Sequence, residues 1–312
     1  MDSVHLAWLI RRHAIEMTNK SGGSHIGSIF SVADIIAVLY ADILKYDTQQ
    51  PLSSARDRFI LSKGHAGVAV YAALAETGFF PTLELQHYYQ NGSRLSGHVS
   101  HAVPGVEIST GSLGHGFSVA LGMALAAKKD GARHKIYTIL GDGECNEGSV
   151  WEAMLFAKRF QLDNLVAIVD YNKMQSLDST EQTMALEPFR LKWSSFGWDT
   201  CEVDGHDHEQ LKAAMQPQFA GRDEKAPRVI IAHTVKGKGV SFMENNLLWH
   251  YRFPHNGWEY EQAVCQLHLA KPDGVADPYT PTGIDNPEPV PEEAMEADKN
   301  LLSASWHPDY RK

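Results

Sequence analysis

Short apolar runs of strand length alternate with longer stretches of helical periodicity along most of this 312-residue chain. Runs rich in β-branched residues predict strands at residues 59–61, 136–140, 165–169, 200–203 and 228–232. The stretches with helical periodicity or many small residues predict helices at residues 6–19, 32–44, 66–77, 118–130 and 148–160. This alternation predicts an α/β fold, a doubly wound parallel sheet with helices on both faces.

The helix expected at residues 32–44 carries a start signal. Ser31 is a suitable N-cap residue, and Asp34 then falls at the third helical position. The longest apolar segment of the chain, residues 26–44, contains this helix. Because Asp34 and Asp42 interrupt the segment, we do not expect it to span a bilayer.

The composition changes near residue 271, where proline and acidic residues become frequent. Seven of the 14 prolines fall between Pro272 and Pro308, and residues 286–293 form an acidic, proline-rich run. We therefore predict a domain at residues 1–270 and an extended arm at residues 271–312. Since the arm has few large apolar residues, among them Tyr279, we expect it to pack on a partner chain.

The overall charge and the cysteines exclude some function classes. A formal net charge of −10 argues against a nucleic-acid partner, because binding nucleic acid needs a basic surface. The three cysteines are dispersed without a Cys-x-x-Cys pair, which indicates a reducing compartment. The chain starts without a secretory signal pattern, so the expected location is cytoplasmic.

The most specific chemistry lies where two predicted strands end. Gly141-Asp142-Gly143 follows the strand at residues 136–140, and Asn172 follows the strand at residues 165–169. A right-handed crossover between parallel strands places Asp142 and Asn172 side by side at the carboxyl edge of the sheet, where ligands bind. Carboxylate and amide oxygens suit Mg²⁺, and glycines allow a phosphate to approach the backbone. The pattern therefore predicts a Mg²⁺-diphosphate site.

The segments Gly141–Gly148 and Asn164–Asn172 together resemble the thiamine-diphosphate motif, and the chain resembles the N-terminal half of transketolase over roughly residues 5 to 260. Other matching segments follow in the same order along the chain: Ser24-His25-Ile26-Gly27, Leu61-Ser62-Lys63-Gly64-His65, Gly97-His98, Pro104 to Gly114, Asp204-Gly205-His206, Lys236-Gly237-Lys238-Gly239-Val240 and Trp249-His250. Several independent motifs in one order are more specific than any single motif.

The resemblance implies thiamine diphosphate and Mg²⁺ as cofactors, and it assigns roles to individual residues. The metal would be held by Asp142, Asn172 and Met174. The cofactor would be bound by His65, Ser112, Leu113, Gly114, Gly141, Asp142, Gly143, Glu144 and Asn172, and His115 could also reach it. The catalytic residues would be His25, His65, His98 and His250, which contact sugar hydroxyls and the reacting carbonyl oxygen.

Two departures from the family pattern affect the expected substrate channel. Ile26 stands where many transketolases have proline, and Tyr251 follows His250 where glycine is usual. The substrate could accordingly differ from the ordinary pentose phosphates. A sulfonated, deoxy or branched sugar phosphate stays open as an alternative.

The resemblance also predicts a partner chain. Glu147 and Glu152 would lie at a subunit interface. The pyrimidine-binding domain that completes the active site in transketolases has no room after residue 260, so we expect a separate chain to supply it, in a dimer of heterodimers. The predicted activity is transfer of a two-carbon ketol unit from a ketose phosphate to an aldose. The alternatives are a subunit of a 2-oxo acid dehydrogenase and a non-catalytic Mg²⁺-nucleotide-binding scaffold.

Two further features are interpreted as structural. His206-Asp207-His208 looks like a metal cluster, but adjacent residues on one loop rarely converge on one ion. Cys145 lies inside the predicted cofactor turn, where we interpret it as a small tolerated residue and not as a nucleophile.

Overall fold

Five parallel strands form the sheet of the computed structural model, which describes residues 1–216 and 225–279. The strands are β1 (Arg58–Leu61), β2 (Ile136–Gly141), β3 (Leu165–Tyr171), β4 (Asp199–Asp204) and β5 (Arg228–His233). Their spatial order is β1-β2-β3-β5-β4, with each neighbouring pair parallel. All five predicted strands are confirmed, and so is the α/β class.

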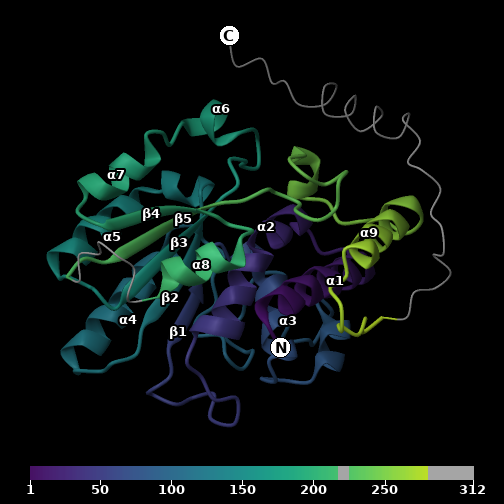
Figure 1. Ribbon diagram of the computed structural model, residues 1–312, viewed down its shortest axis with the longest axis horizontal. Coiled ribbons are helices and arrows are strands. Elements are labelled where there is room, and N and C mark those ends of the chain that lie inside the picture. Colours follow the sequence, from purple (N-terminus) through teal and green to yellow (C-terminus); the bar gives the residue numbers. More distant parts are fainter. Residues whose placement is uncertain (217–224, 280–312) are drawn as a thin grey trace.

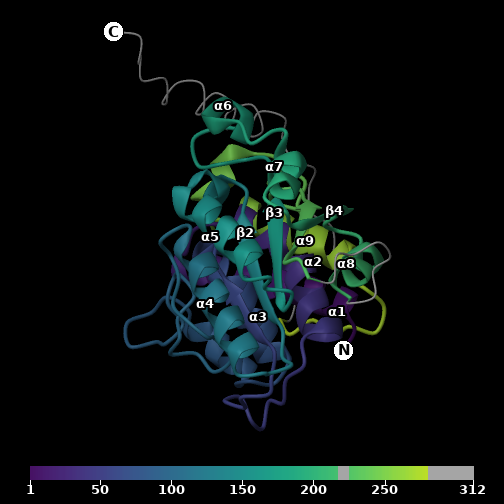
Figure 2. The ribbon, with the colours of Figure 1, turned by 90° about the vertical axis from the view of Figure 1, so that its left-hand side faces the viewer.

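Helices cover both faces of the sheet (Figure 1). They are α1 (Ser3–Ser21), α2 (Ile26–Val38), α3 (Gly67–Glu76), α4 (His115–Lys129), α5 (Gly148–Arg159), α6 (Thr180–Met184), α7 (Phe189–Ser195), α8 (His208–Met215) and α9 (Trp258–Leu269). One apolar core joins α1, α2, α3, α8 and α9 to the first face, and a second joins α4, α5 and α7 to the other. Figure 2 views the molecule from the α4–α5 side.

The central strands β2 and β3 are mostly apolar because both of their faces are buried, whereas the edge strand β4 is partly exposed and carries three acidic residues. Along β2, Tyr137 and Ile139 belong to one core, whereas Ile136 and Leu140 belong to the other. Every residue of β2 and β3 is buried. Continuous apolar runs of this kind are typical of parallel strands covered by helices on both sides, which is why they were visible in the sequence.

The predicted start of the second helix is wrong. Helix α2 begins at Ile26, and the turn Leu39–Ile43 continues it with π-helical geometry. Ser31 is therefore not an N-cap but a buried residue within the helix, and its hydroxyl donates to Asp170 over 2.6 Å. Asp34 likewise lies inside the helix, where Arg11 binds its carboxylate. Ser31 and Asp34 instead bind residues far away in the sequence, and a local capping pattern does not reveal such contacts.

The apolar character of residues 26–43 has a structural explanation. The segment Ile26–Ile43 is long and apolar enough to cross a membrane by composition, and 83% of it is buried inside the fold. Helix α2 packs against α1, α3 and α8. The segment is thus a core helix of this domain, as both of its aspartates indicated.

The first residues of the predicted arm pack on this chain itself. Val275 contacts the apolar surface of α1, Asp277 binds Arg12, and the Tyr279 hydroxyl lies 2.8 Å from Nδ1 of His13. The guanidinium of Arg12 also lies over the Tyr279 ring, 4.7 Å from its centroid. Tyr279 thus packs on its own chain in this structure, and packing of the arm on a partner stays a prediction. The rest of the arm, residues 280–312, lies outside the described residues.

Candidate functional site

The predicted site residues meet at the carboxyl edge of the sheet. A cavity of about 340 Å³ opens there, between the ends of β1, β2 and β3 and the loops that follow α1 and β5. The predicted residues that line it are His25, His65, His98, Leu113, Gly141, Asp142, Gly143, Glu144, Asn172, Met174 and His250. The structure thus brings together segments that lie more than 200 positions apart in the sequence.

Asp142 and Asn172 occupy one corner of this cavity. They follow β2 and β3, which pair in register with Gly141 opposite Asp170. The carboxylate of Asp142 accepts hydrogen bonds from the backbone N–H groups of Gly143, at 2.7 Å, and Lys173, at 2.5 Å. The amide oxygen of Asn172 accepts one from Met174 N–H at 3.1 Å. We call Asp142, Asn172 and Met174 the carboxylate corner.

The donor set of the carboxylate corner fits a hard cation. It offers a carboxylate, a side-chain amide oxygen and the Met174 carbonyl, which are oxygen ligands of the kind Mg²⁺ takes when phosphate and water complete its shell. Burial, together with the nearby Asp170 carboxylate, raises the pKa of Asp142 to about 7. A bound divalent cation would favour the ionised form and reverse this shift.

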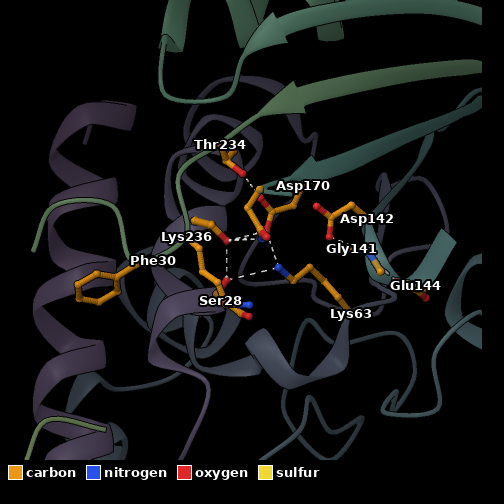
Figure 3. A network of polar contacts seen from close by, with 12 residues as sticks. Ser28, Phe30, Lys63, Gly141, Asp142, Glu144, Asp170, Thr234 and Lys236 are labelled. Atoms are coloured by element: carbon orange, nitrogen blue, oxygen red, sulfur yellow. Dashed lines mark hydrogen bonds and ion pairs between the residues drawn. The ribbon is translucent and has the colours of Figure 1, made fainter. Parts of the chain in front are cut away.

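A buried ion pair supports the floor of the cavity. Lys63 follows β1 and binds Asp170 at the end of β3, with both side chains almost completely buried. The hydroxyls of Ser31 and Thr234 also donate to Asp170. Figure 3 shows Lys63 and Thr234 approaching this carboxylate from different sides. Burial alone would raise the pKa of Asp170, but the Lys63 ammonium and the hydroxyls together lower it, so the carboxylate is ionised.

A second buried lysine reaches the cavity from the loop after β5. The ammonium of Lys236 lies 2.6 Å from Nδ1 of His250 and 3.5 Å from the Met174 carbonyl oxygen. Burial and the neighbouring Lys63 ammonium lower the pKa of Lys236 to about 8. Two lysine ammonium groups therefore face the same cavity as the carboxylate corner. Their positive charge makes the part of the cavity next to them suitable for an anion.

Four histidines form another part of the cavity wall. The ring centroid of His25 lies 5.1 Å from that of His65, 6.0 Å from that of His98 and 5.5 Å from that of His250. Burial lowers the pKa of His25 to about 4 and that of His250 to about 3, and it also lowers the pKa of His65 and His98. All four imidazoles of this histidine cluster are therefore neutral near pH 7.

His25 has the most unusual conformation of the four. Its backbone lies in the left-handed region, with φ at 73°, directly before α2. Its Nδ1 atom is buried and has no hydrogen-bond partner. A strained backbone and an unpaired buried nitrogen are costly, and they persist at positions where a ligand is to be bound. His25 thus has an unused hydrogen-bonding atom within the site.

Glu144 uses its carboxylate for contacts within the chain. Although it lines the cavity, its carboxylate accepts hydrogen bonds from Gly114 N–H at 2.8 Å, from Gly141 N–H at 3.1 Å and from the Ser62 hydroxyl. These contacts join the ends of β1 and β2 to the start of α4. Gly114 adopts φ of +79°, and a Cβ atom there would lie 2.3 Å from Ser149 Oγ, so only glycine fits this turn.

Some predicted residues lie beside the cavity and not in its wall. Ser112 is exposed, and Gly114 contributes its N–H to Glu144. His115 is also exposed, with Nδ1 beside the Leu113 carbonyl oxygen. Glu147 and Glu152 are exposed at the start of α5. In the single chain, Glu147 and Glu152 are therefore surface residues.

Two structural interpretations from the sequence agree with the geometry. His206 and His208 both bind the Asp34 carboxylate, and Asp207 caps α8 by accepting hydrogen bonds from two backbone N–H groups. Cys145 is fully buried, and burial raises the pKa of its thiol. It therefore lacks the exposed thiolate that a nucleophile needs.

Lys63, Asp170 and Lys236 were given no role by the sequence patterns. Each lysine lies in one of the matching segments, a few residues after a predicted strand, and Asp170 directly follows the predicted strand at residues 165–169. That position was the available signal, because side chains at the carboxyl edge of a parallel sheet converge on its ligand. Tyr251 was noted as a departure, and it does line the cavity, 5.4 Å from the His25 ring.

Comparison with known proteins gives the family. The family model described as "Transketolase, thiamine diphosphate binding domain" matches residues 3–251. The chain is 42% identical over 257 residues to a subunit of the apulose-4-phosphate transketolase of Phocaeicola vulgatus, covering 82% of this chain and 90% of that protein. It is 43% identical over 251 residues to the 6-deoxy-6-sulfo-D-fructose transketolase subunit SqwG of a Clostridium species, covering 80% and 90%.

A solved structure is similar across the whole fold. The transketolase of Campylobacter jejuni superposes with a TM-score of 0.80 at 26% identity, and it covers 96% of this chain. The chain spans 46% of the length of that enzyme. The fold and the family model define a thiamine-diphosphate-binding α/β domain. The chain belongs to the transketolase family and corresponds to its N-terminal, thiamine-diphosphate-binding part, which confirms the prediction from the sequence.

Proposed function

We propose that this chain is the diphosphate-binding subunit of a two-chain transketolase. With a partner chain, it transfers a two-carbon ketol unit from a ketose phosphate, or a similar donor, to an aldose. The observation that carries this proposal is the joint placement of the carboxylate corner, two lysines and four neutral histidines around one cavity. The carboxylate corner and the two lysines suit a metal-bound diphosphate, and the four histidines suit a polyhydroxylated substrate.

The proposed cofactors are thiamine diphosphate and Mg²⁺. Asp142, Asn172 and the Met174 carbonyl would hold the metal, and Lys63 and Lys236 would face the diphosphate. Thiamine diphosphate, when bound, supplies the nucleophilic carbon for cleavage of a ketose. The oxygen donors of the corner and its raised carboxylate pKa support the metal assignment.

The histidine cluster would act on the substrate. A neutral imidazole donates a hydrogen bond through one nitrogen and accepts through the other. Because the other three rings lie within about 6 Å of His25, the four imidazoles can bind several hydroxyls and move a proton at the carbonyl oxygen without adding charge to the cavity. The unpaired Nδ1 of His25 offers one of these contacts directly.

The partner would carry the pyrimidine-binding domain. The two relatives described above are themselves called transketolase subunits, which supports a divided enzyme. Glu147 and Glu152 are proposed as interface residues of a dimer of heterodimers. Their exposure supports this role, as do the exposed apolar side chains Leu155, Phe156 and Phe160 on and after the same helix.

The donor sugar is proposed only as a class. One relative is named for apulose-4-phosphate and the other for 6-deoxy-6-sulfo-D-fructose, yet this chain is almost equally identical to both. Pentose phosphates and modified ketoses are therefore the substrates to assay first.

A two-part experiment tests the proposal. Thermal unfolding of the chain is measured with thiamine diphosphate and Mg²⁺, and separately with ATP and Mg²⁺; only the first should raise the Tm. The chain that co-purifies is then identified by mass spectrometry, and ketol transfer is assayed for each chain and for the pair. Equal protection by ATP would favour a nucleotide-binding scaffold. Turnover of a 2-oxo acid instead of a ketose would favour the dehydrogenase class, and ketol transfer by this chain alone would contradict the two-chain proposal.

A further inference from the structure

A polar cluster outside the cavity binds the loop that carries Lys236. The cluster consists of Arg11 on α1, Asp34 on α2, and His206 and His208 at the start of α8, and we call it the Asp34 cluster. The loop comprises residues 234–239 after β5, and we call it the lysine loop. The Asp34 cluster contributes no residue to the cavity wall, whereas Lys236 at the centre of the lysine loop does.

Asp34 organises the cluster through its two carboxylate oxygens. Arg11 donates to both of them, over 3.0 Å and 2.6 Å. His206 Nδ1 lies 2.6 Å from one oxygen, and His208 Nε2 lies 3.2 Å from the other. Although burial would by itself raise the pKa of Asp34, Arg11 and the two histidines hold it well below its usual value. The carboxylate is thus an ionised acceptor that fixes three side chains in direction.

Two of these side chains reach the lysine loop on either side of Lys236. The backbone N–H of Val235 donates to His206 Nε2 over 2.8 Å, and Arg11 Nε donates to the Lys238 carbonyl oxygen over 2.9 Å. Because Nε2 of His206 accepts a hydrogen bond, the proton of the neutral ring is on Nδ1, where it is donated to Asp34. Each contact to the loop is therefore oriented by the same carboxylate.

The loop has little freedom between these two contacts. Gly237 adopts φ of +82°, and a Cβ atom there would lie 2.3 Å from the Met243 carbonyl oxygen. Its N–H donates to the Gly27 carbonyl oxygen at the start of α2, over 3.0 Å. The Lys236 carbonyl oxygen accepts from Asn245 N–H over 2.9 Å. With the backbone fixed at both flanks, the Lys236 side chain extends to His250 and Met174.

We infer that the Asp34 cluster positions Lys236, and that His206 and Arg11 are the positioning residues. A buried charged network is weak evidence for stability alone, because apolar residues of similar volume can stabilise a core equally well. Directional hydrogen bonds to backbone atoms on both sides of one residue fix where its side chain points. His208 shares the Asp34 carboxylate but bonds to Ser3, not to the lysine loop, so it is a matched control.

The experiment measures acylation of Lys236 in the full chain at one fixed pH. A limiting amount of an amine-acylating ester is added, and labelling of Lys236 is quantified by mass spectrometry relative to the exposed Lys129. In the wild-type chain, the buried Lys236 should react slowly. His206→Asn keeps a donor near Asp34 but loses the acceptor for Val235 N–H, so labelling should increase about fivefold, the effect expected for one lost hydrogen bond. His206→Gln restores an amide oxygen near the position of Nε2 and should react like the wild type.

Two further variants decide the outcome. His208→Gln should leave labelling of Lys236 unchanged. Arg11→Lys can pair with Asp34 but cannot also donate to Lys238 from a second nitrogen, so it should increase labelling, and it provides a second test if His206→Asn does not fold. Equal increases in the labelling of Lys236 in His206→Asn and His208→Gln would overturn the inference. It would also be overturned if labelling increased neither in His206→Asn nor in Arg11→Lys.

The inference rests on the proposed function only for the ligand that Lys236 faces. Binding of Mg²⁺-pyrophosphate, measured by calorimetry, tests that ligand separately. Acylation that follows the expected order supports the positioning role even if pyrophosphate does not bind, and in that case the proposed function fails alone.

Discussion

The carboxylate corner and the histidine cluster share one cavity but differ in how they are held. In the corner, Asp142 and Asn172 accept hydrogen bonds from backbone N–H groups of their own loops. In the cluster, His25 has a strained backbone and a buried nitrogen without a partner. The corner is thus organised by this chain before a ligand binds, whereas the cluster has a hydrogen-bonding atom that only a ligand or a partner chain would use. Cofactor binding and turnover should respond differently to substitution.

The largest effect is expected in the histidine cluster. His65→Ala should lower kcat/KM of the assembled two-chain enzyme by about 10²–10⁴-fold, the usual contribution of a general acid or base. Affinity for thiamine diphosphate should fall much less. Steady-state kinetics and calorimetry measure the two quantities, with His87→Ala, an exposed histidine outside the cavity, as the control. Equal losses of cofactor binding and turnover would remove the distinction between the two regions.

The buried ion pair beneath the corner should give the next largest effect. Lys63→Met leaves the Asp170 carboxylate without its ammonium partner, and removal of one member of a buried pair costs about 3–5 kcal/mol. The matched control is Lys128→Met, since the Lys128–Asp163 pair is exposed and such pairs contribute about 0–1 kcal/mol. Urea denaturation measures both. Adding Asp170→Asn to Lys63→Met should recover part of the loss; a further loss would show that the pair is not the cause.

Substitution in the corner itself should separate binding from stability. Asp142→Ala removes the one carboxylate among the three proposed metal ligands, so affinity for Mg²⁺-thiamine diphosphate should fall about 100-fold or more, since loss of even an outer-shell partner costs about 10–100-fold. Its free energy of unfolding without ligand should fall by no more than about 1–3 kcal/mol, because the loss of two hydrogen bonds from backbone N–H groups is partly offset by removal of a buried carboxyl of raised pKa. Calorimetry measures the affinity of Asp142→Ala for Mg²⁺-thiamine diphosphate, and His98→Gln, a substitution in the histidine cluster, is the comparison. Unchanged cofactor affinity in Asp142→Ala would rule out the corner as the metal site.

The smallest effect is on the pH dependence of stability, and it has opposite signs in the two regions. His250 has a folded pKa of about 3 against an ordinary value of 6.5, so the unfolded chain takes up the proton first and stability falls as pH drops below about 6.5. Asp142 has a folded pKa of about 7 against 3.8, so it lowers stability as pH rises from about 4 to 7.

Two variants of the chain without ligand test these signs by urea denaturation between pH 5 and 7.5. His250→Gln should lose less stability than the wild type on acidification, by about 1–2 kcal/mol, since one pKa unit corresponds to 1.36 kcal/mol. Asp142→Asn should gain stability relative to the wild type as pH rises. Parallel curves for all three proteins would show that neither group is shifted as described.

Much of the fold could be predicted from the sequence because its central strands are apolar on both faces. The runs at 136–140 and 165–169 identified β2 and β3, and parallel pairing then placed Asp142 beside Asn172. The start of α2 could not be predicted, because His25 begins the helix in a left-handed conformation and Ser31, a good capping residue, bonds to Asp170 instead. The roles of Lys63, Lys236 and Asp34 depend on contacts between residues far apart in the sequence, which local patterns do not specify.

Glu144 has a consequence for the internal motions of the molecule. Its single carboxylate accepts hydrogen bonds from Ser62, Gly114 and Gly141, which belong to three separate segments around the cavity. Opening any one of these segments breaks a hydrogen bond to the carboxylate that also binds the other two. The amides of Gly114 and Gly141 should therefore exchange with solvent deuterium through one cooperative opening of the cavity floor, with a common free energy, and not through independent local fluctuations.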